Sequence, residues 1–124
     1  MAKAKFQGRY IWNTAGDWVA TLVGEYLWDL SGNWVGWIEA NGDVYRADGE
    51  WIGTLSKDSR ILRKRTASHR PLRTDLPPTP QKPDLPGRAP LPPTFAELPY
   101  SIIDVLEEEP ETFKRFSERR PDMD

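Results

Sequence analysis

Apolar and polar residues alternate in short runs through the first half of the chain. The runs are rich in Val, Ile, Leu, Thr, Tyr and Trp, and residues typical of turns separate them about every 7–9 positions. Alternation with a period of two predicts β-strands rather than helices. The spacing of the turns therefore predicts a meander of about seven short antiparallel strands within residues 6–65.

A sequence repeat underlies this alternation. The segment Tyr10–Val19 recurs sixteen positions later as Tyr26–Val35, and shorter copies follow at Tyr45–Gly53 and Asp58–Leu62. Each copy is typical of a β-hairpin. Apolar residues on both faces of the strands predict a sheet that curls and packs on itself. Small residues at equivalent positions would relieve crowding opposite the large tryptophan rings, and these are Ala20, Gly36 and Gly53.

The turns of these hairpins have two kinds of signature. Asn13–Gly16 and Asp29–Gly32 place an Asx first and a Gly fourth, which predicts a type I turn followed by a left-handed glycine. Asn41-Gly42 and Asp48-Gly49 are typical of two-residue type I′ turns, and Gly24 suits the same role between the first two copies.

All six tryptophans precede residue 52, and they have two interpretations. A domain of ~60 residues needs large side chains to bury enough apolar area, which places the rings in the core. The alternative is a platform on which rings stack against sugars, bases or prolines. Trp37 is the best platform candidate because it breaks the repeat. In that alternative the β domain is a glycan- or peptide-binding module.

The second half of the chain has a proline pattern instead. All twelve prolines lie between Pro71 and Pro121. Four of them recur every third residue, which is the period of polyproline II, and leucines precede several prolines. This arm, residues 66–99, is either a stiff spacer or a strip that docks in an aromatic groove. The groove would belong to a partner or to the Trp-rich domain itself.

The C-terminal residues 100–120 predict two short helices. Ser101–Asp104 resembles a capping box, and Pro110 suits the first position of a second helix. The apolar side chains of this segment form a stripe too short for a core of its own. We therefore expect it to dock on the β domain or on another protein.

The arrangement as a whole is similar to a known family. Its hairpin repeat at Asn13–Trp18, Asp29–Trp34, Gly36–Ile38, Asp48–Gly53 and Leu55–Leu62, followed by the proline-rich stretch, resembles the four-fold β-flower proteins, a small bacterial family. The resemblance implies an all-β fold, in which three to four repeated hairpins curl into a barrel-like or flower-like sheet. It implies no established activity, catalytic residue or cofactor.

Composition excludes several classes of function. The chain has 124 residues and no Cys, so it has no disulfide framework, thiolate zinc site or Cys nucleophile. His69 is its single histidine, which excludes a multi-histidine metal site. We expect no enzyme and no metal or cofactor. No run approaches the ~18 apolar residues of a membrane span, and no signal peptide is visible, so we expect a cytoplasmic protein without membrane insertion.

Charge is distributed unevenly. The net charge of −2 excludes a uniformly basic nucleic-acid-binding protein, yet residues 57–73 hold seven basic residues against Asp58. This basic segment is a solvated hinge, a phosphate-binding patch for electrostatic nucleic-acid association, or a docking site for an acidic partner or the chain's own acidic tail. Nucleic acid is the less favoured of these partners.

These patterns predict a non-catalytic accessory or adaptor protein. A β-hairpin-repeat domain (6–65) precedes the arm (66–99) and the helical docking segment (100–120). The arm and the docking segment are expected to bind a larger protein or complex, with a homo-oligomer as the alternative. The residues expected to make this contact are Leu76, Pro77, Pro80, Pro83, Leu85, Pro86, Leu91, Ile102, Ile103, Leu106, Phe113 and Phe116.

Overall fold

The computed structural model describes residues 8–113, which form an eight-stranded antiparallel sheet and one short helix. Each strand pairs with the next one along the chain. The predicted all-β meander is therefore confirmed. The elements are β1 (Arg9–Trp12), β2 (Trp18–Val23), β3 (Tyr26–Trp28), β4 (Trp34–Ile38), β5 (Asp43–Arg46), β6 (Trp51–Leu55), β7 (Ile61–Lys64), β8 (Ile102–Asp104) and α1 (Val105–Glu108).

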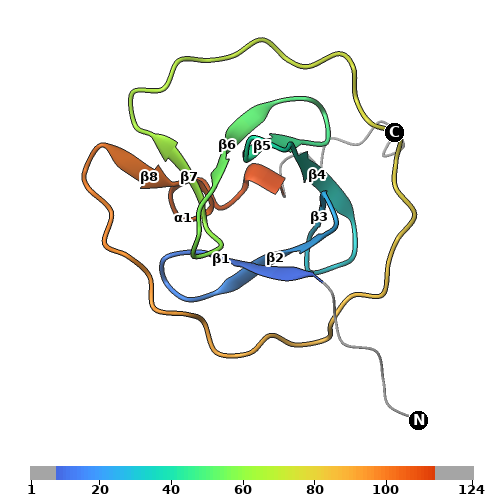
Figure 1. Ribbon diagram of the computed structural model, residues 1–124, viewed down its shortest axis with the longest axis horizontal. Coiled ribbons are helices and arrows are strands. Elements are labelled where there is room, and N and C mark those ends of the chain that lie inside the picture. The colour runs from blue at the N-terminus through green and yellow to red at the C-terminus, as the bar shows by residue number, and fades with distance from the viewer. Residues whose placement is uncertain (1–7, 114–124) are drawn as a thin grey trace.

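Four hairpins are arranged around a common centre (Figure 1). In chain order they are β1–β2, β3–β4, β5–β6 and β7–β8, and we refer to them as the first to fourth hairpins. Short turns form the tips of the first three. The two strands of the fourth are joined instead by the long proline-rich segment, which leaves after β7 and returns before β8.

β8 corrects the prediction that a helix starts at this place. Arg63 of β7 lies opposite Ile103, so the segment extends the sheet. The helix begins one turn later, where the side chain of Asp104 caps it by accepting a hydrogen bond from the Glu107 N–H. An apolar run of this length does not distinguish strand from helix. Most of the second predicted helix, Phe116 included, lies outside the described residues.

Five turns share one backbone pattern. The N–H of the first residue donates to the carbonyl of the fifth, and the N–H of the fourth donates to the carbonyl of the first. The fourth residue has a positive φ, from 67° at Ser59 to 100° at Gly49, which is the conformation that glycine adopts at no steric cost. These turns begin at Asn13, Asp29, Glu39, Arg46 and Ser56.

This pattern confirms the turns predicted at Asn13 and Asp29 but corrects the other two. The turns containing Gly42 and Gly49 are not two-residue type I′ turns. They begin at Glu39 and Arg46, and each glycine is the left-handed fourth residue. An Asx-Gly dipeptide satisfies both turn types, and the pairing of the flanking strands decides between them.

The small residues of the repeat serve a close approach of backbones. A Cβ atom at Gly36 would collide with the carbonyl oxygen of Tyr45 on the neighbouring strand. A Cβ atom at Gly53 would lie 2.6 Å from the carbonyl oxygen of Leu62. The crowding that these glycines relieve therefore comes from the next hairpin's backbone rather than from tryptophan rings.

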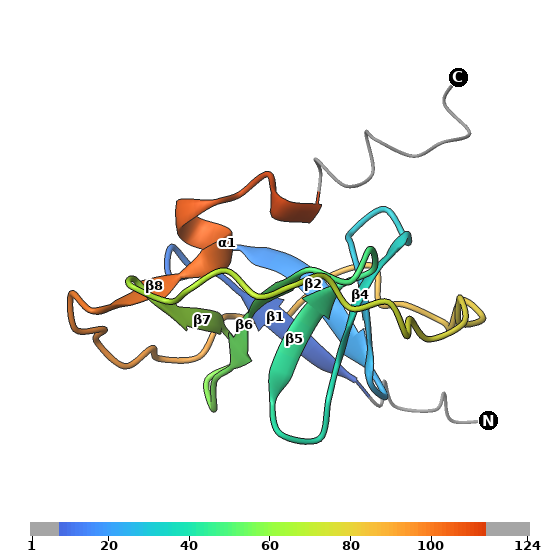
Figure 2. The same cartoon turned by 90° about the horizontal axis from the view of Figure 1, so that it is seen from above.

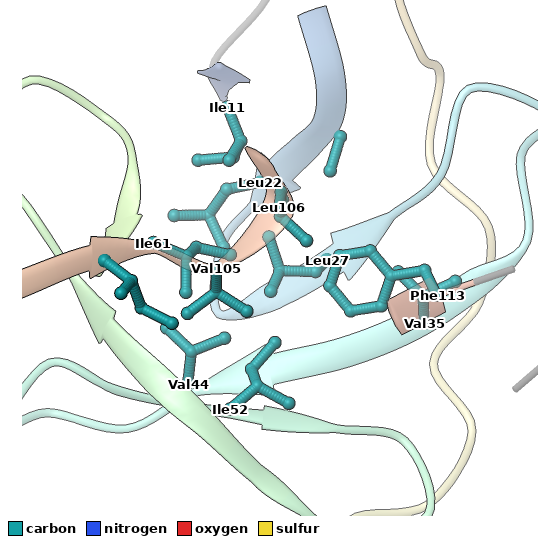
Figure 3. Packing of buried hydrophobic residues seen from close by; sticks show 12 residues of the cluster. Ile11, Leu22, Leu27, Val35, Val44, Ile52, Ile61, Val105, Leu106 and Phe113 are labelled. Carbon is teal, nitrogen blue, oxygen red and sulfur yellow. The ribbon is translucent and has the colours of Figure 1, made fainter. Parts of the chain in front are cut away.

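The core lies at the centre of the four hairpins and receives apolar side chains from all eight strands. Val105 of α1 is fully buried among them, and Leu106 and Phe113 are 4% and 7% exposed (Figure 3). Figure 2 shows α1 on one side of the strands. The C-terminal segment thus docks on the β domain, and β8 and α1 complete the core of that domain.

Residues 66–99, which we call the belt, run around the outside of the hairpins from the tip of the fourth and back to it (Figure 1). Their burial repeats every third residue. Pro77, Pro80, Pro83 and Pro86 are half-buried, whereas the residues between them are exposed except for Leu85. One edge of a polyproline II helix meets a surface with this period. The prolines therefore face the chain's own β domain.

Candidate functional site

The belt contacts the tips of the hairpins in the reverse of their chain order. At the third hairpin the N–H of Arg73 donates to the carbonyl of Gly49, at 2.9 Å. At the second, Lys82 reaches over the turn, because a Cβ atom at Gly32 would lie 2.6 Å from its Nζ. At the first, Pro92 lies 3.5 Å from the Cβ position of Gly16. The belt is therefore bound along its length.

Two arginines anchor the start of the belt on the third hairpin. The guanidinium of Arg70 lies 3.8 Å from the centroid of the Trp51 ring, and its Nη1 is 3.3 Å from Asp43 Oδ2. Arg73 lies over Tyr45, with 5.0 Å between guanidinium carbon and ring centroid. Its hydrogen bonds to Asp75 lower the pKa of that carboxyl to about 2. Stacking plus ion pairing holds this end of the belt in place.

The end of the belt is anchored by a buried arginine. Arg60 is 1% exposed, donates to the carbonyl of Ala96 at 2.8 Å and lies over the ring of Phe95. Its guanidinium also makes two hydrogen bonds to Asp58. Burial alone would raise the pKa of Asp58, but the hydrogen bonds from Arg60 and Ser56 outweigh it and lower that pKa to about 2. Asp58 in turn accepts from the N–H of Ala96.

Arg60 also belongs to a polar network that includes the turn of the first hairpin. Arg60 Nη1 donates to Thr14 Oγ1 at 2.9 Å, and Thr14 Oγ1 donates to Asp104 Oδ2 at 2.7 Å. Asp104 is 4% exposed and also accepts from the N–H of Thr14. The network links the first strand pair to β8, and it satisfies polar groups that would otherwise be buried without partners.

A groove opens where the two ends of the belt meet the fourth hairpin. Leu62 and Lys64 share one face of β7, and Ile102 lies opposite Lys64 on that face. The groove, which we call the belt-end groove, has a volume of about 600 Å³. Its lining contains four basic side chains and no carboxylate: Trp51, Thr54, Leu62, Arg63, Lys64, Ala67, Ser68, His69, Arg70, Leu98 and Ile102.

A second cavity continues this groove. It has a volume of about 310 Å³ and shares Trp51, Arg63, Ala67, Ser68 and His69 with the first. Glu50 and Glu109 line it as well as Arg63 and Arg65, so this cavity carries both signs of charge. The five shared residues show that the two cavities adjoin.

Three of the predicted contact residues lie in the core. Ile103, Leu106 and Phe113 are buried within this chain. Pro77, Pro80, Pro83, Leu85 and Pro86 of the belt are half-buried, whereas Leu76 and Leu91 are 43% and 90% exposed. Among the predicted residues that the structure describes, the belt-end groove contains Ile102.

Trp37, the predicted ligand platform, is 5% exposed and stacks on Tyr45 with 5.2 Å between ring centroids. The structure thus places it in the packed interior. Sequence reasoning missed Trp51 and Leu98 as groove residues. They are far apart in sequence, and no local signal brings them together. The basic segment 57–73 was the one feature of the sequence that pointed to the groove, because it contains the groove residues Lys64, His69 and Arg70.

Within residues 8–113, no group of three or more His, Asp or Glu side chains is placed to hold a metal ion. Among the same residues, no helix is long and apolar enough to cross a membrane.

The repeated hairpins around one centre define a β-hairpin-repeat protein. The family described as 4-fold beta flower protein matches residues 2–103, most of the chain, and the chain belongs to that family. The resemblance noted from the repeat is thereby confirmed. The 4-fold beta flower family is not a known enzyme family. No curated protein and no solved structure matches the chain.

Proposed function

We propose that this protein is a non-catalytic accessory protein that binds another protein through the belt-end groove. The observation that carries the proposal is the groove itself, a concave and largely apolar surface of about 600 Å³ on a small domain. Concavities of this size and lining are typical of binding sites. Both ends of the belt contribute to its walls, so the long proline-rich segment shapes the site as well as joining β7 to β8.

The shape of the site supports a protein partner. The second cavity adjoins the groove through five shared lining residues and so enlarges the concave surface. Two large side chains that are close to groove residues in the sequence are exposed: Tyr100 at 82% and Leu72 at 59%. Each lies two residues from a groove residue, Ile102 or Arg70. Exposed aromatic and aliphatic side chains beside a concave site are typical of interfaces.

A photo-cross-linking residue placed in the groove tests this function. Ser68 is exposed and lines both cavities, so Ser68→p-benzoylphenylalanine reports on an occupant. Gly87 is the matched control, because it is exposed on the belt and does not line the groove. We expect one partner protein to be captured from position 68 and not from position 87.

The captured partner must then bind the purified full-length chain at a defined stoichiometry. We expect Ser68→Trp, which fills the groove, to weaken that binding at least tenfold without changing the circular dichroism spectrum. Equal capture from both positions, no capture from position 68, or unchanged affinity of Ser68→Trp would each contradict the proposed function.

A further inference from the structure

The basic side chains of the segment 57–73 divide into three groups, the third of which is Lys57 alone, outside the belt-end groove. Five are arginines, and each is paired with a carboxylate of this chain: Arg60, Arg63, Arg65, Arg70 and Arg73. Arg63 and Arg65 pair with Glu109 and Glu108, so part of the segment docks on the chain's own acidic run. Pairing within the chain accounts for most of the positive charge that the sequence concentrates here.

Lys64 and His69 form the second group. Within residues 8–113 neither side chain has an ion pair or a hydrogen bond, and both are exposed and line the belt-end groove. They stand on different walls, because Lys64 belongs to β7 and His69 to the belt. No carboxylate lines this groove with them. An anionic group that entered between Lys64 and His69 could accept hydrogen bonds from side chains that have no other acceptor among the described residues.

Other residues of the groove lining are apolar and would pack against an apolar group of the occupant. Leu62, Leu98 and Ile102 are half-buried, and Trp51 adds an aromatic wall. Leu62 and Ile102 lie on the same face of the fourth hairpin as Lys64. An occupant that satisfies the groove therefore presents an apolar side chain and a carboxylate close together. A short extended peptide in which apolar and acidic residues follow one another supplies both groups from neighbouring residues.

This inference rests on the proposed function: we infer that the occupant of the belt-end groove is an extended segment of the partner protein. The segment contains both acidic and apolar residues, and Lys64 and His69 recognise it. Its carboxylates meet Lys64 and His69, the basic groove residues whose side chains have no ion pair or hydrogen bond among the described residues. Its apolar side chains pack on Trp51, Leu62 and Ile102. Complementary charge also speeds the encounter, so binding weakens as salt rises.

Synthetic peptides test the inference on the full-length protein. The probe is an acetylated and amidated eight-residue peptide in which leucine alternates with glutamate. The comparison peptides carry glutamine or lysine in place of glutamate. His69 is the sole histidine of the chain, so its ring signals in a proton NMR spectrum report groove occupancy without assignment of the remaining residues.

We expect the glutamate peptide to shift the His69 signals in a saturable way, and the glutamine peptide to bind at least tenfold more weakly. Lys64→Met should weaken the glutamate peptide severalfold, and Lys64→Glu at least tenfold. Lys57→Glu is the matched control, because Lys57 is exposed in the same basic segment but does not line the groove. It should leave the affinity unchanged.

Three results would overturn the inference. They are equal binding of the glutamate and glutamine peptides, equal effects of Lys64→Glu and Lys57→Glu, and no shift of the His69 signals with any peptide. If the cross-linked partner still binds in the groove under any of these results, recognition of acidic residues fails and the proposed function stands. If no partner is captured from position 68, the proposed function fails first.

Discussion

The guanidinium of Arg60 pairs with the carboxylate of Asp58 across the turn between β6 and β7. Nη2 lies 2.8 Å from Oδ2, and Nε lies 3.1 Å from Oδ1. The same guanidinium reaches Thr14 of the first hairpin and Ala96 of the belt. One buried cation therefore joins two parts of the sheet to the returning end of the belt.

Arg60→Met should destabilise the protein strongly, because it removes the guanidinium partner of Asp58 and the donor to Thr14 Oγ1 and to the Ala96 carbonyl. We expect the free energy of unfolding to fall by about 3 kcal/mol or more, as when one partner of a buried ion pair is removed. Arg65→Met is the control, because its ion pair is exposed and such pairs contribute about 0–1 kcal/mol. Urea denaturation measures both, and similar losses would contradict the role given to Arg60.

Asp58 should make stability depend on pH in the acid range. Its pKa falls from the ordinary 3.8 to about 2 on folding. Since the folded pKa is the lower one, the stabilisation is complete above about pH 4 and is lost as the pH falls towards 2. The contribution at stake is about 2 kcal/mol. Asp58→Asn should therefore flatten the curve of unfolding free energy against pH between about pH 4 and 2. An unchanged slope would contradict the shift.

Gly36 should tolerate no side chain, because a Cβ atom there meets the carbonyl oxygen of Tyr45 on the next strand. We expect Gly36→Ala to lower the free energy of unfolding by about 1–3 kcal/mol, as overpacking does. Gly87→Ala provides the comparison, because nothing lies within 4 Å of the Cβ position at Gly87. Thermal unfolding of the two variants measures the difference, and equal midpoints would show that the strands do not approach as closely as described.

Phe113 should matter to the fold of the β domain although it lies after the last strand. It is 7% exposed and packs in the central cluster with Leu106 and Val105. Phe113→Ala should cost about 3–5 kcal/mol, the usual loss for a buried aromatic residue. Leu91→Ala, at a position 90% exposed, should cost almost nothing. If Phe113→Ala unfolds at the same urea concentration as the unchanged protein, the C-terminal segment is not part of the core.

Much of the fold follows from local patterns in the sequence. The repeat of Tyr10–Val19 at Tyr26–Val35 predicts the hairpins, and the prolines at every third position predict an edge that meets a surface. The sequence could not say which surface. The contacts that decide it, such as Arg73 with Gly49 and Arg60 with Ala96, join residues far apart in the chain.

Contacts between distant parts of the chain also explain why β8 and the belt-end groove were not predicted from the sequence. β8 follows β7 only after the whole belt, and its three residues become a strand because β7 offers an unpaired edge. The belt-end groove combines Trp51, Lys64 and Leu98 from three separate parts of the chain. The charge pattern of residues 57–73 pointed to this region, but only side-chain pairing in the folded protein shows which basic side chains of the groove remain without a carboxylate.

The belt-end groove requires the belt to be bound to its own domain, because without it the groove loses the walls that Ala67 to Arg70 and Leu98 provide. Amide hydrogen exchange of the full-length protein, followed residue by residue by NMR, tests this directly. The N–H of Arg73 donates to Gly49 and that of Ala96 to Asp58. We predict slow exchange at Arg73 and Ala96 and fast exchange at the exposed Gly87. Exchange at Arg73 and Ala96 as fast as at Gly87 would show that the belt is not bound, and would contradict the account.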